Sequence, residues 1–322
     1  MTDFVWLNGQ YLPRKDTKIT LLESGLLYGY GVFETLLIYS WKPFQLGAHY
    51  ERLKSSAKHI RMPVNISIKS LQTAINRLVQ LNHIEHGFVR IAVSSSDEPM
   101  KSMKFSSSDY STGKESPAPR GVSTNAPRGT GGSYQTSMIF IETGPVSPEY
   151  KKYRQSGGSI IIYPYRRSSE TPYYKHKTLA YMENLLARRW AFKYKAIEAI
   201  FINTDNYIME GTRSTIFIVK DRKVFTPSIE SNILRGITRQ VVIGLCTKNA
   251  IKIREKPMEK EEIFSADEVF LTSSLMEIMP VISCKIKTEN NTAEKNIGDQ
   301  LIGPITRILQ NSFKELLQIS CK

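Results

Sequence analysis

Residues 176–189 read His-Lys-Thr-Leu-Ala-Tyr-Met-Glu-Asn-Leu-Leu-Ala-Arg-Arg, and this stretch decides the fold more than any other. The segment just before it, 159–165, is rich in isoleucine and tyrosine, as strands are. Apolar residues then recur at helical spacing and predict a helix from Leu179 to Tyr194. Lys177 therefore lies at a strand–helix junction. Burial there would lower the pKa of its amine and make it a nucleophile for carbonyl groups, although a lone lysine is by default a solvated surface group.

The sequence predicts further strands and helices on both sides of this stretch. On the C-terminal side we expect strands at 196–203, 214–219 and 267–274 and helices from Ile237 and over Pro304–Leu317. On the N-terminal side we expect a hairpin turning at Asn8–Gly9, helices over His49–Ile60 and Ser70–Asn82, and a strand over Phe88–Ser94. The pattern predicts an α+β domain over residues 1–142, a linker at 143–149 and a second domain, rich in alternating strands and helices, over 150–322.

Residues from about 95 to 133 interrupt the first domain and are rich in Ser, Gly, Pro and Thr. They show no helical or strand periodicity, so they cannot bury enough surface to offset the entropy of ordering. We expect a flexible insertion.

Three further features complement Lys177. Gly236 precedes the helix that begins at Ile237 and Thr238, and a helix N-terminus with free N–H groups binds phosphate well. Thr272, Ser273 and Ser274 follow a buried strand, and Glu210 follows a hairpin. Each is ordinary alone, as a helix start, a turn or a surface glutamate. Together they supply the amine, phosphate donors and carboxylate that a phosphorylated aldehyde cofactor needs.

Six blocks in order carry a family resemblance: 28–37, 49–60, 176–189, 202–219, 225–242 and 266–281. Over nearly the whole chain apart from the insertion, the sequence is similar to class IV, or fold type IV, pyridoxal-phosphate enzymes. The resemblance implies the two-domain α+β and α/β fold of D-amino-acid aminotransferases, pyridoxal 5'-phosphate as cofactor, a homodimer and an enzyme of amino-acid metabolism. The three cysteines, odd in number and far apart, fit a reducing cytoplasm.

The resemblance also implies roles for single residues. Lys177 looks like the Schiff-base lysine and proton carrier, and Glu210 like the partner of the pyridine nitrogen. The residues that resemble the remaining cofactor contacts are Arg52, Ser274, Ile237 and Thr238 for the phosphate and Tyr181 for the phenolic oxygen. Tyr28 and Phe33 would line the substrate pocket, and Arg90 would anchor a carboxylate.

Two positions depart from the family pattern. Thr215 stands where the family's EGTxSN element has asparagine, and Tyr30 where YGDG has aspartate. At both positions the side chain differs from the family's, so its contacts with neighbouring residues are expected to differ as well.

Three reactions are open: 4-amino-4-deoxychorismate lysis, which yields p-aminobenzoate for folate biosynthesis, branched-chain aminotransfer and D-amino-acid aminotransfer. The Thr-Ser-Ser-Leu-Met-Glu run at 272–277 and the Arg-Gly-Thr-Gly-Gly-Ser-Tyr run at 128–134 resemble the lyases more, and the Arg-x-His trap of D-amino-acid enzymes has no match. The lyase is therefore favoured over the transaminases.

The composition excludes several other classes of protein. A net charge of +14 is spread along the chain without a nucleic-acid motif, so it indicates a basic surface that attracts anionic substrates rather than nucleic-acid binding. A basic binding protein without catalysis is the remaining alternative, and the joint presence of Lys177, Glu210 and Arg52 argues against it. The three cysteines form no CxxC pair, which argues against a zinc site or a disulfide framework. No run approaches the roughly 18 apolar residues of a membrane helix.

Overall fold

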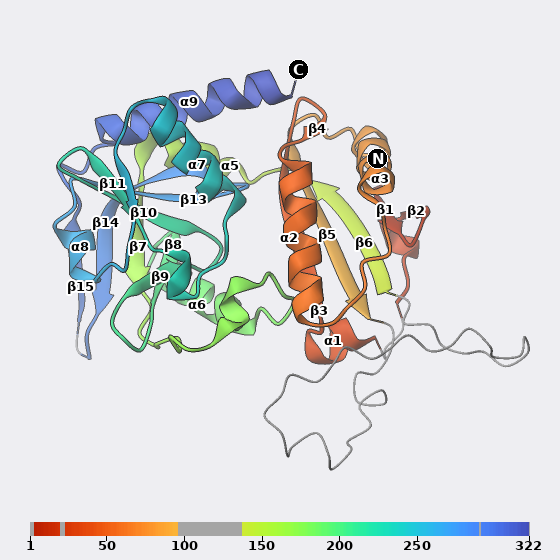
Figure 1. Cartoon of the computed structure of the whole chain (residues 1–322), viewed down its shortest axis with the longest axis horizontal. Coiled ribbons are helices and arrows are strands. Elements are labelled where there is room, and N and C mark those ends of the chain that lie inside the picture. Colours follow the sequence, from red (N-terminus) through yellow and green to blue (C-terminus); the bar gives the residue numbers. More distant parts are fainter. Residues whose placement is uncertain (1–2, 20–22, 96–136, 290, 322) are drawn as a thin grey trace, which may run out of the picture.

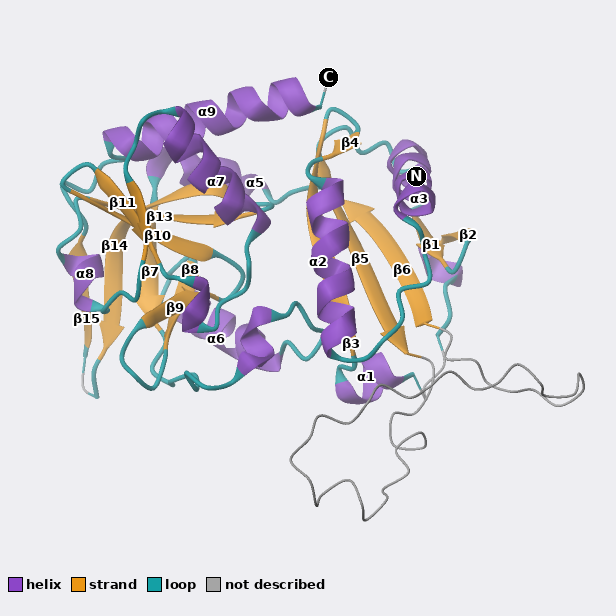
Figure 2. Ribbon diagram, viewed as in Figure 1, coloured by secondary structure: helices purple, strands orange, loops and turns teal. Residues whose placement is uncertain are grey.

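A computed structural model describes residues 3–19, 23–95, 137–289 and 291–321. Two sheets, one from each half of the chain, lie side by side with helices packed on them (Figure 1). The expected insertion at about 95–133 lies almost entirely outside the described residues. The mixture of helices and sheets is the α+β architecture that the sequence predicts (Figure 2).

The first half is an antiparallel sheet of six strands in the order β2-β1-β6-β5-β3-β4. Its strands are β1 (Phe4–Leu7), β2 (Gln10–Pro13), β3 (Gly31–Tyr39), β4 (Lys42–Pro43), β5 (Gly87–Ser95) and β6 (Ser137–Gly144). Its helices are α1 (Ser24–Tyr28), α2 (Leu46–His59) and α3 (Ile68–Leu81), with a short 3-10 turn η1 (Arg14–Asp16). Asn8 and Gly9, both at positive φ, make the tight turn between β1 and β2 that the sequence predicts.

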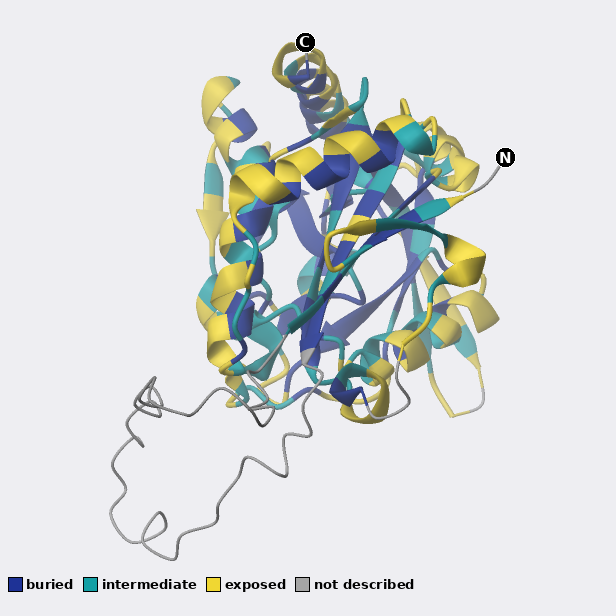
Figure 3. Ribbon diagram, turned by 90° about the vertical axis from the view of Figure 1, so that its right-hand side faces the viewer, coloured by how far each residue is buried: buried dark blue, intermediate teal, exposed yellow. Residues whose placement is uncertain are grey.

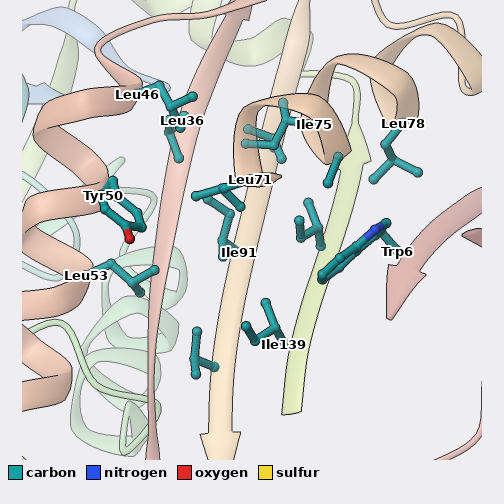
Figure 4. Packing of buried hydrophobic residues seen from close by; sticks show 14 of the residues in the cluster. Trp6, Leu36, Leu46, Tyr50, Leu53, Leu71, Ile75, Leu78, Ile91 and Ile139 are labelled. Atoms are coloured by element: carbon teal, nitrogen blue, oxygen red, sulfur yellow. The ribbon is translucent and has the colours of Figure 1, made fainter. Parts of the chain in front are cut away.

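Helix α3 shows why these residues fold as they do. Leu71, Ile75 and Leu78 recur every three or four positions, are fully buried, and so form one apolar stripe against the sheet. The Ser67 hydroxyl accepts a hydrogen bond from the Ser70 N–H and caps the helix start. Figure 4 shows this stripe meeting Ile91 and other side chains of the sheet.

The second half is a mixed sheet of nine strands in the order β12-β11-β10-β13-β14-β7-β8-β9, with β15 paired to β14. Its strands are β7 (Gly158–Ile162), β8 (Glu198–Ile202), β9 (Ile208–Gly211), β10 (Thr215–Lys220), β11 (Lys223–Thr226), β12 (Ile253–Glu255), β13 (Glu268–Ser273), β14 (Glu277–Lys287) and β15 (Thr292–Asn296). Its helices are α5 (Pro148–Ser156), α6 (Met182–Lys193), α7 (Ile237–Lys248), α8 (Glu261–Phe264) and α9 (Pro304–Ser320), with 3-10 turns η3 (Pro172–Lys175) and η4 (Ile229–Ser231).

Helices cover the second sheet because its central strands are apolar throughout. Every residue of β8 is buried, and so is every residue of β10 except Lys220 at its end. Helix α6 packs on β8, and α7 and α9 pack on β13. Figure 3 shows the helices turning their exposed residues away from the sheets. None of the described helices is both long and apolar enough to cross a membrane.

Helix α6 differs from its prediction. It begins at Met182, three residues later than the expected Leu179, because the residues before it pair with the first half of the chain. Thr178 forms an antiparallel bridge with Val32, and the Leu179 N–H donates to the Gly31 carbonyl over 2.8 Å. Lys177 therefore lies on an extended segment that follows η3, and not at the foot of a helix.

Candidate active site

A pocket of about 430 Å³ lies where the two halves meet. Phe33, Arg52 and Arg90 line it from the first half. The second half supplies α6, the turn after β9, the start of α7 and the end of β13. Of the residues predicted for the site, the structure gathers these at the pocket: Phe33, Arg52, Arg90, Lys177, Tyr181, Glu210, Ile237, Thr238 and Ser274.

The backbone of Lys177 is held by the first half of the chain. Its carbonyl accepts from the Phe33 N–H over 3.1 Å, and its N–H donates to the Ser56 hydroxyl over 3.1 Å. Its Nζ lies 4.3 Å from the centroid of the Phe33 ring. These contacts fix where the amine enters the pocket.

The surroundings of the Lys177 amine favour its uncharged form. Burial, together with the positive charge of Arg52, lowers its pKa to about 8. A much larger fraction is then uncharged near neutral pH than for an ordinary lysine, so the lone pair is available to a carbonyl carbon.

Glu210 lies on β9 and lines the same pocket. One carboxylate oxygen accepts from the Leu234 N–H over 3.1 Å, and the other from Arg167 Nη1 over 3.4 Å. Burial raises the pKa of this carboxyl to about 7, and Arg167 opposes the shift. The carboxylate can therefore accept or share a proton with a basic group placed beside it.

Arg167, which the sequence pattern does not single out, lies beside Glu210. The side chain is 1% exposed and donates to Glu183 over 3.0 Å and to Asn184 over 2.9 Å, in addition to Glu210. Its guanidinium also lies 3.3 Å from the centroid of the Phe201 ring. Arg167 thus holds the carboxylate of Glu210 in place. The two residues are 43 positions apart in the sequence, so only the folded structure shows this contact.

Arg52 is held by a fully buried carboxylate, Glu34. Its Nε and Nη2 donate to the two oxygens of Glu34, each over 2.7 Å, which is a bidentate pair. His49 Nδ1 lies 2.7 Å from the same carboxylate. Although burial opposes ionisation, Arg52 and His49 hold the pKa of Glu34 well below its ordinary value. Arg52 Nη1 donates across to the Arg235 carbonyl over 2.8 Å, next to the start of α7.

The start of α7 is built to bind an anion. Its N-cap is Gly236, which has no side chain, so no side-chain oxygen caps the first N–H groups, those of Ile237 and Thr238. Ser274 and the buried Thr272 hydroxyl, which has no hydrogen-bond partner, line the same pocket. With Arg52 beside them, these groups fit a phosphate.

Tyr181 packs edge-on against Phe33, with ring centroids 5.4 Å apart. Its hydroxyl donates to the Thr212 carbonyl over 2.5 Å, and Asn184 donates to the same carbonyl over 2.5 Å. Burial raises the pKa of the phenol above its ordinary value, so the phenol stays protonated. Its one hydroxyl hydrogen is engaged by the Thr212 carbonyl, and the ring lines the pocket.

Of the remaining residues predicted to bind the substrate, one lines the pocket and one does not. Arg90 lines the pocket and pairs with Glu142 over 3.3 Å. Tyr28 does not line it: the residue is 57% exposed on α1. Tyr30 has a structural contact, since its hydroxyl donates to the Ile60 carbonyl over 2.5 Å.

The turn from Gly211 to Ser214 does not depend on an asparagine at position 215. Glu198, fully buried, accepts from the Thr212 N–H, the Thr212 hydroxyl and the Ser214 hydroxyl at 3.2, 2.5 and 3.0 Å. Thr215 itself pairs with Thr272 in the sheet. A buried carboxylate thus organises the turn.

Within the described residues, no group of three or more His, Cys, Asp or Glu side chains is placed to hold a metal ion. The pocket instead joins a lysine of lowered pKa, a helix N-terminus beside Arg52 and a carboxylate. That combination, between two such sheets, defines a pyridoxal-phosphate enzyme. The family profile described as amino-transferase class IV matches residues 31–284, and the chain belongs to that family. Enzymes of this class depend on pyridoxal phosphate, so the expected cofactor and enzyme class are confirmed.

Named relatives perform different reactions. The chain is 28% identical over 315 residues to a putative branched-chain-amino-acid aminotransferase of Methanocaldococcus jannaschii, covering 97% of this chain and 96% of the relative. It is 27% identical to an aminodeoxychorismate lyase of Bacillus subtilis (97% and 94% covered) and 28% identical to a D-alanine aminotransferase of Staphylococcus epidermidis (98% and 98%).

A solved structure supports the fold. The crystal structure of the branched-chain aminotransferase of Escherichia coli aligns with a TM-score of 0.80 at 27% identity, covering 98% of this chain and 95% of that one. The predicted fold type is therefore confirmed.

Proposed function

We propose that this chain is a 4-amino-4-deoxychorismate lyase, releasing p-aminobenzoate and pyruvate. The observation that carries the proposal is the charge of the pocket, whose described lining residues include six arginines and Lys177 but one carboxylate, Glu210. Four of the arginines pair with carboxylates, and the other two, Arg188 and Arg213, form no ion pair with the described residues. Such a pocket suits a substrate with two carboxylates, held beside a phosphorylated cofactor. The run at 272–277, part of which lines the pocket, supports the same reaction, as does the Bacillus subtilis relative. The other supporting run, 128–134, lies outside the described residues.

The cofactor would be held by residues from both halves. Lys177 would attach its aldehyde, and Arg52, Ser274 and the N–H groups of Ile237 and Thr238 would hold its phosphate. When bound, pyridoxal phosphate supplies an electron sink that stabilises a carbanion next to the substrate nitrogen. Glu210 would keep a proton at the pyridine nitrogen. Tyr181 would contact the phenolic oxygen by turning its hydroxyl from the Thr212 carbonyl to the cofactor.

The chain's own residues would then move one proton. The Lys177 amine, free once the substrate amino group has taken its place on the cofactor aldehyde, would take the proton from the ring carbon that bears that amino group. The ring becomes aromatic as its C–O bond to the enolpyruvyl group breaks, and the leaving group gains a proton to become pyruvate. Arg90 would anchor a substrate carboxylate, while Phe33 packs against the ring. No other reactant is needed, because the atoms of the substrate equal those of the two products.

The test is a side-by-side assay of the holoenzyme. We expect pyruvate release from aminodeoxychorismate, and no comparable amino transfer from leucine, glutamate or D-alanine to keto acids. Amino transfer without pyruvate release would refute the lyase and favour the second candidate, an amino-acid aminotransferase, to which the relatives from Methanocaldococcus and Staphylococcus point.

We also propose that the protein works as a homodimer. Leu26, Leu27 and Tyr28 on α1 and Met182, Leu185 and Leu186 on α6 are each between 47% and 67% exposed. The two groups adjoin, because a Cβ at Gly29, which ends α1, would lie 2.9 Å from the Ala180 Cα. An apolar surface built from two neighbouring helices is typical of a subunit interface, and it would bring Tyr28 to the partner.

A further inference from the structure

Two arginines of the pocket form no ion pair with a carboxylate of the described residues. Arg52, Arg90, Arg167 and Arg239 each form an ion pair with a carboxylate. Arg188, on α6, and Arg213, in the turn after β9, form none with the described residues. Arg188 Nη1 and Arg213 Nε are buried and have no hydrogen-bond partner. Buried donors without acceptors are costly, so a native structure that keeps them requires an explanation.

Glu198, the carboxylate whose charge acts on Arg188, forms no ion pair with it and is bonded to the turn instead. Besides the three bonds from Thr212 and Ser214, its Oε1 accepts from the Ala199 N–H over 3.1 Å. Glu198 therefore holds the backbone that carries Arg213 and leaves the two guanidinium groups unmatched. Position 198 shapes this wall of the pocket.

Tyr150, on α5, completes the wall. The Arg213 guanidinium lies 5.2 Å from the centroid of the Tyr150 ring, and Tyr150 also interacts with Arg188. Burial, and next the charge of Arg213, lower the pKa of Arg188, which shows that the two cations repel each other. An anion between them would relieve this repulsion and satisfy the free donors.

We propose that Arg188, Arg213 and Tyr150 form a second anion subsite, which binds a carboxylate of the substrate remote from the reacting amino group. A guanidinium is planar and matches a carboxylate with two hydrogen bonds. The phosphate seat at α7 is built from other residues, so this subsite is left for the substrate. The inference deepens the proposed function, on which it rests, by specifying a substrate with two acidic groups.

Binding of matched probes tests the subsite without turnover. Calorimetry with the holoenzyme would compare α,ω-dicarboxylates from succinate to suberate with the monocarboxylates of the same chain length. Because hydrogen bonds to charged groups contribute strongly, we expect the best diacid to bind roughly 10-fold to 100-fold more tightly than its monoacid. Arg188→Gln and Arg213→Gln should each remove most of that preference, and Arg213→Lys should restore part of it.

Arg189→Gln is the matched control, since Arg189 is the next residue on α6, is exposed and does not line the pocket. It should keep the full preference for diacids. Equal binding of diacids and monoacids by the wild-type protein, or a preference that survives in both Gln variants with normal cofactor content, would overturn the subsite.

Pyruvate release, measured on the same preparations, separates this inference from the proposed function. A diacid preference that depends on Arg188 and Arg213, in a protein that releases no pyruvate, would leave the subsite standing and refute the lyase. Pyruvate release without an arginine-dependent preference would refute the subsite alone.

Discussion

Replacing Glu210 with glutamine tests the mechanism more directly than any other change at this site. The amide has nearly the size of the carboxylate but only one oxygen, so it keeps one of the two contacts, with Leu234 N–H or with Arg167. The Lys177 amine and the phosphate seat are untouched. The variant should therefore bind the cofactor and keep its fold while losing the negative charge beside the pyridine nitrogen.

The size of the effect follows from where the charge lies. The pKa of Glu210 is about 7, so at pH 8 about nine-tenths of the protein carries the carboxylate even before a cationic partner is bound. A buried, oriented charge of this kind stabilises the transition state by about 3 kcal/mol. At 1.36 kcal/mol for each factor of ten, kcat should fall by about 10²-fold.

The assay is kcat at pH 8, with cofactor content measured from its absorbance. Glu183→Gln is the matched control, because Glu183 also pairs with Arg167 but does not line the pocket. It should keep most of the activity. Near wild-type kcat in Glu210→Gln with full cofactor content would refute the reasoning and remove Glu210 from the chemistry.

Other predictions concern the lysine, the buried ion pair and the interface. Borohydride reduction and peptide mapping should place the cofactor on Lys177 rather than Lys175, and Lys177→Ala should abolish turnover without loss of fold. The rate at which the apoprotein takes up pyridoxal phosphate should rise with pH and then level off, with the midpoint of the rise near pH 8, because burial lowers the pKa of Lys177. A midpoint near pH 10.5 would contradict this. Glu34→Gln should lower the free energy of unfolding by about 3–5 kcal/mol by leaving Arg52 unpaired. Since the pKa of Glu34 is below its ordinary value in the folded state, the contribution of Glu34 is present above pH 4.5 and is lost as pH falls further; denaturant titration of both proteins at several pH values would show whether the difference shrinks in acid. Leu26→Glu should shift sedimentation from dimer to monomer, and an unchanged sedimentation coefficient would place the interface elsewhere.

Local pattern predicted the regular elements well where the signal was strong. The helix expected over Ser70–Asn82 is α3, Ile68–Leu81, because its apolar stripe is unbroken and its cap is local. Helix α6 was placed three residues too early, since the segment before it is held extended by β3, more than 140 residues away in the sequence. Periodicity in one segment carries no information about such a partner.

The same limit applies to the site. The family resemblance, not the composition, brought Lys177, Glu210 and Arg52 together, and the structure places all three at one pocket. It did not identify Glu34, although Glu34 lies within a quoted block, because the block does not show that its side chain meets Arg52. Arg167 is 43 residues from Glu210, so their contact exists only after folding.

Arg52 also connects the two halves of the molecule. Its guanidinium is locked to the first sheet by Glu34 and donates to a backbone carbonyl of the second half at Arg235, where the cofactor phosphate would lie. A ligand held at this junction would contact both halves of the chain. Its binding would therefore stabilise their association. At a free cofactor concentration 100 times its Kd, that stabilisation amounts to about 2.7 kcal/mol. The two halves of the cofactor-free protein would therefore be held together less firmly than those of the cofactor-bound protein.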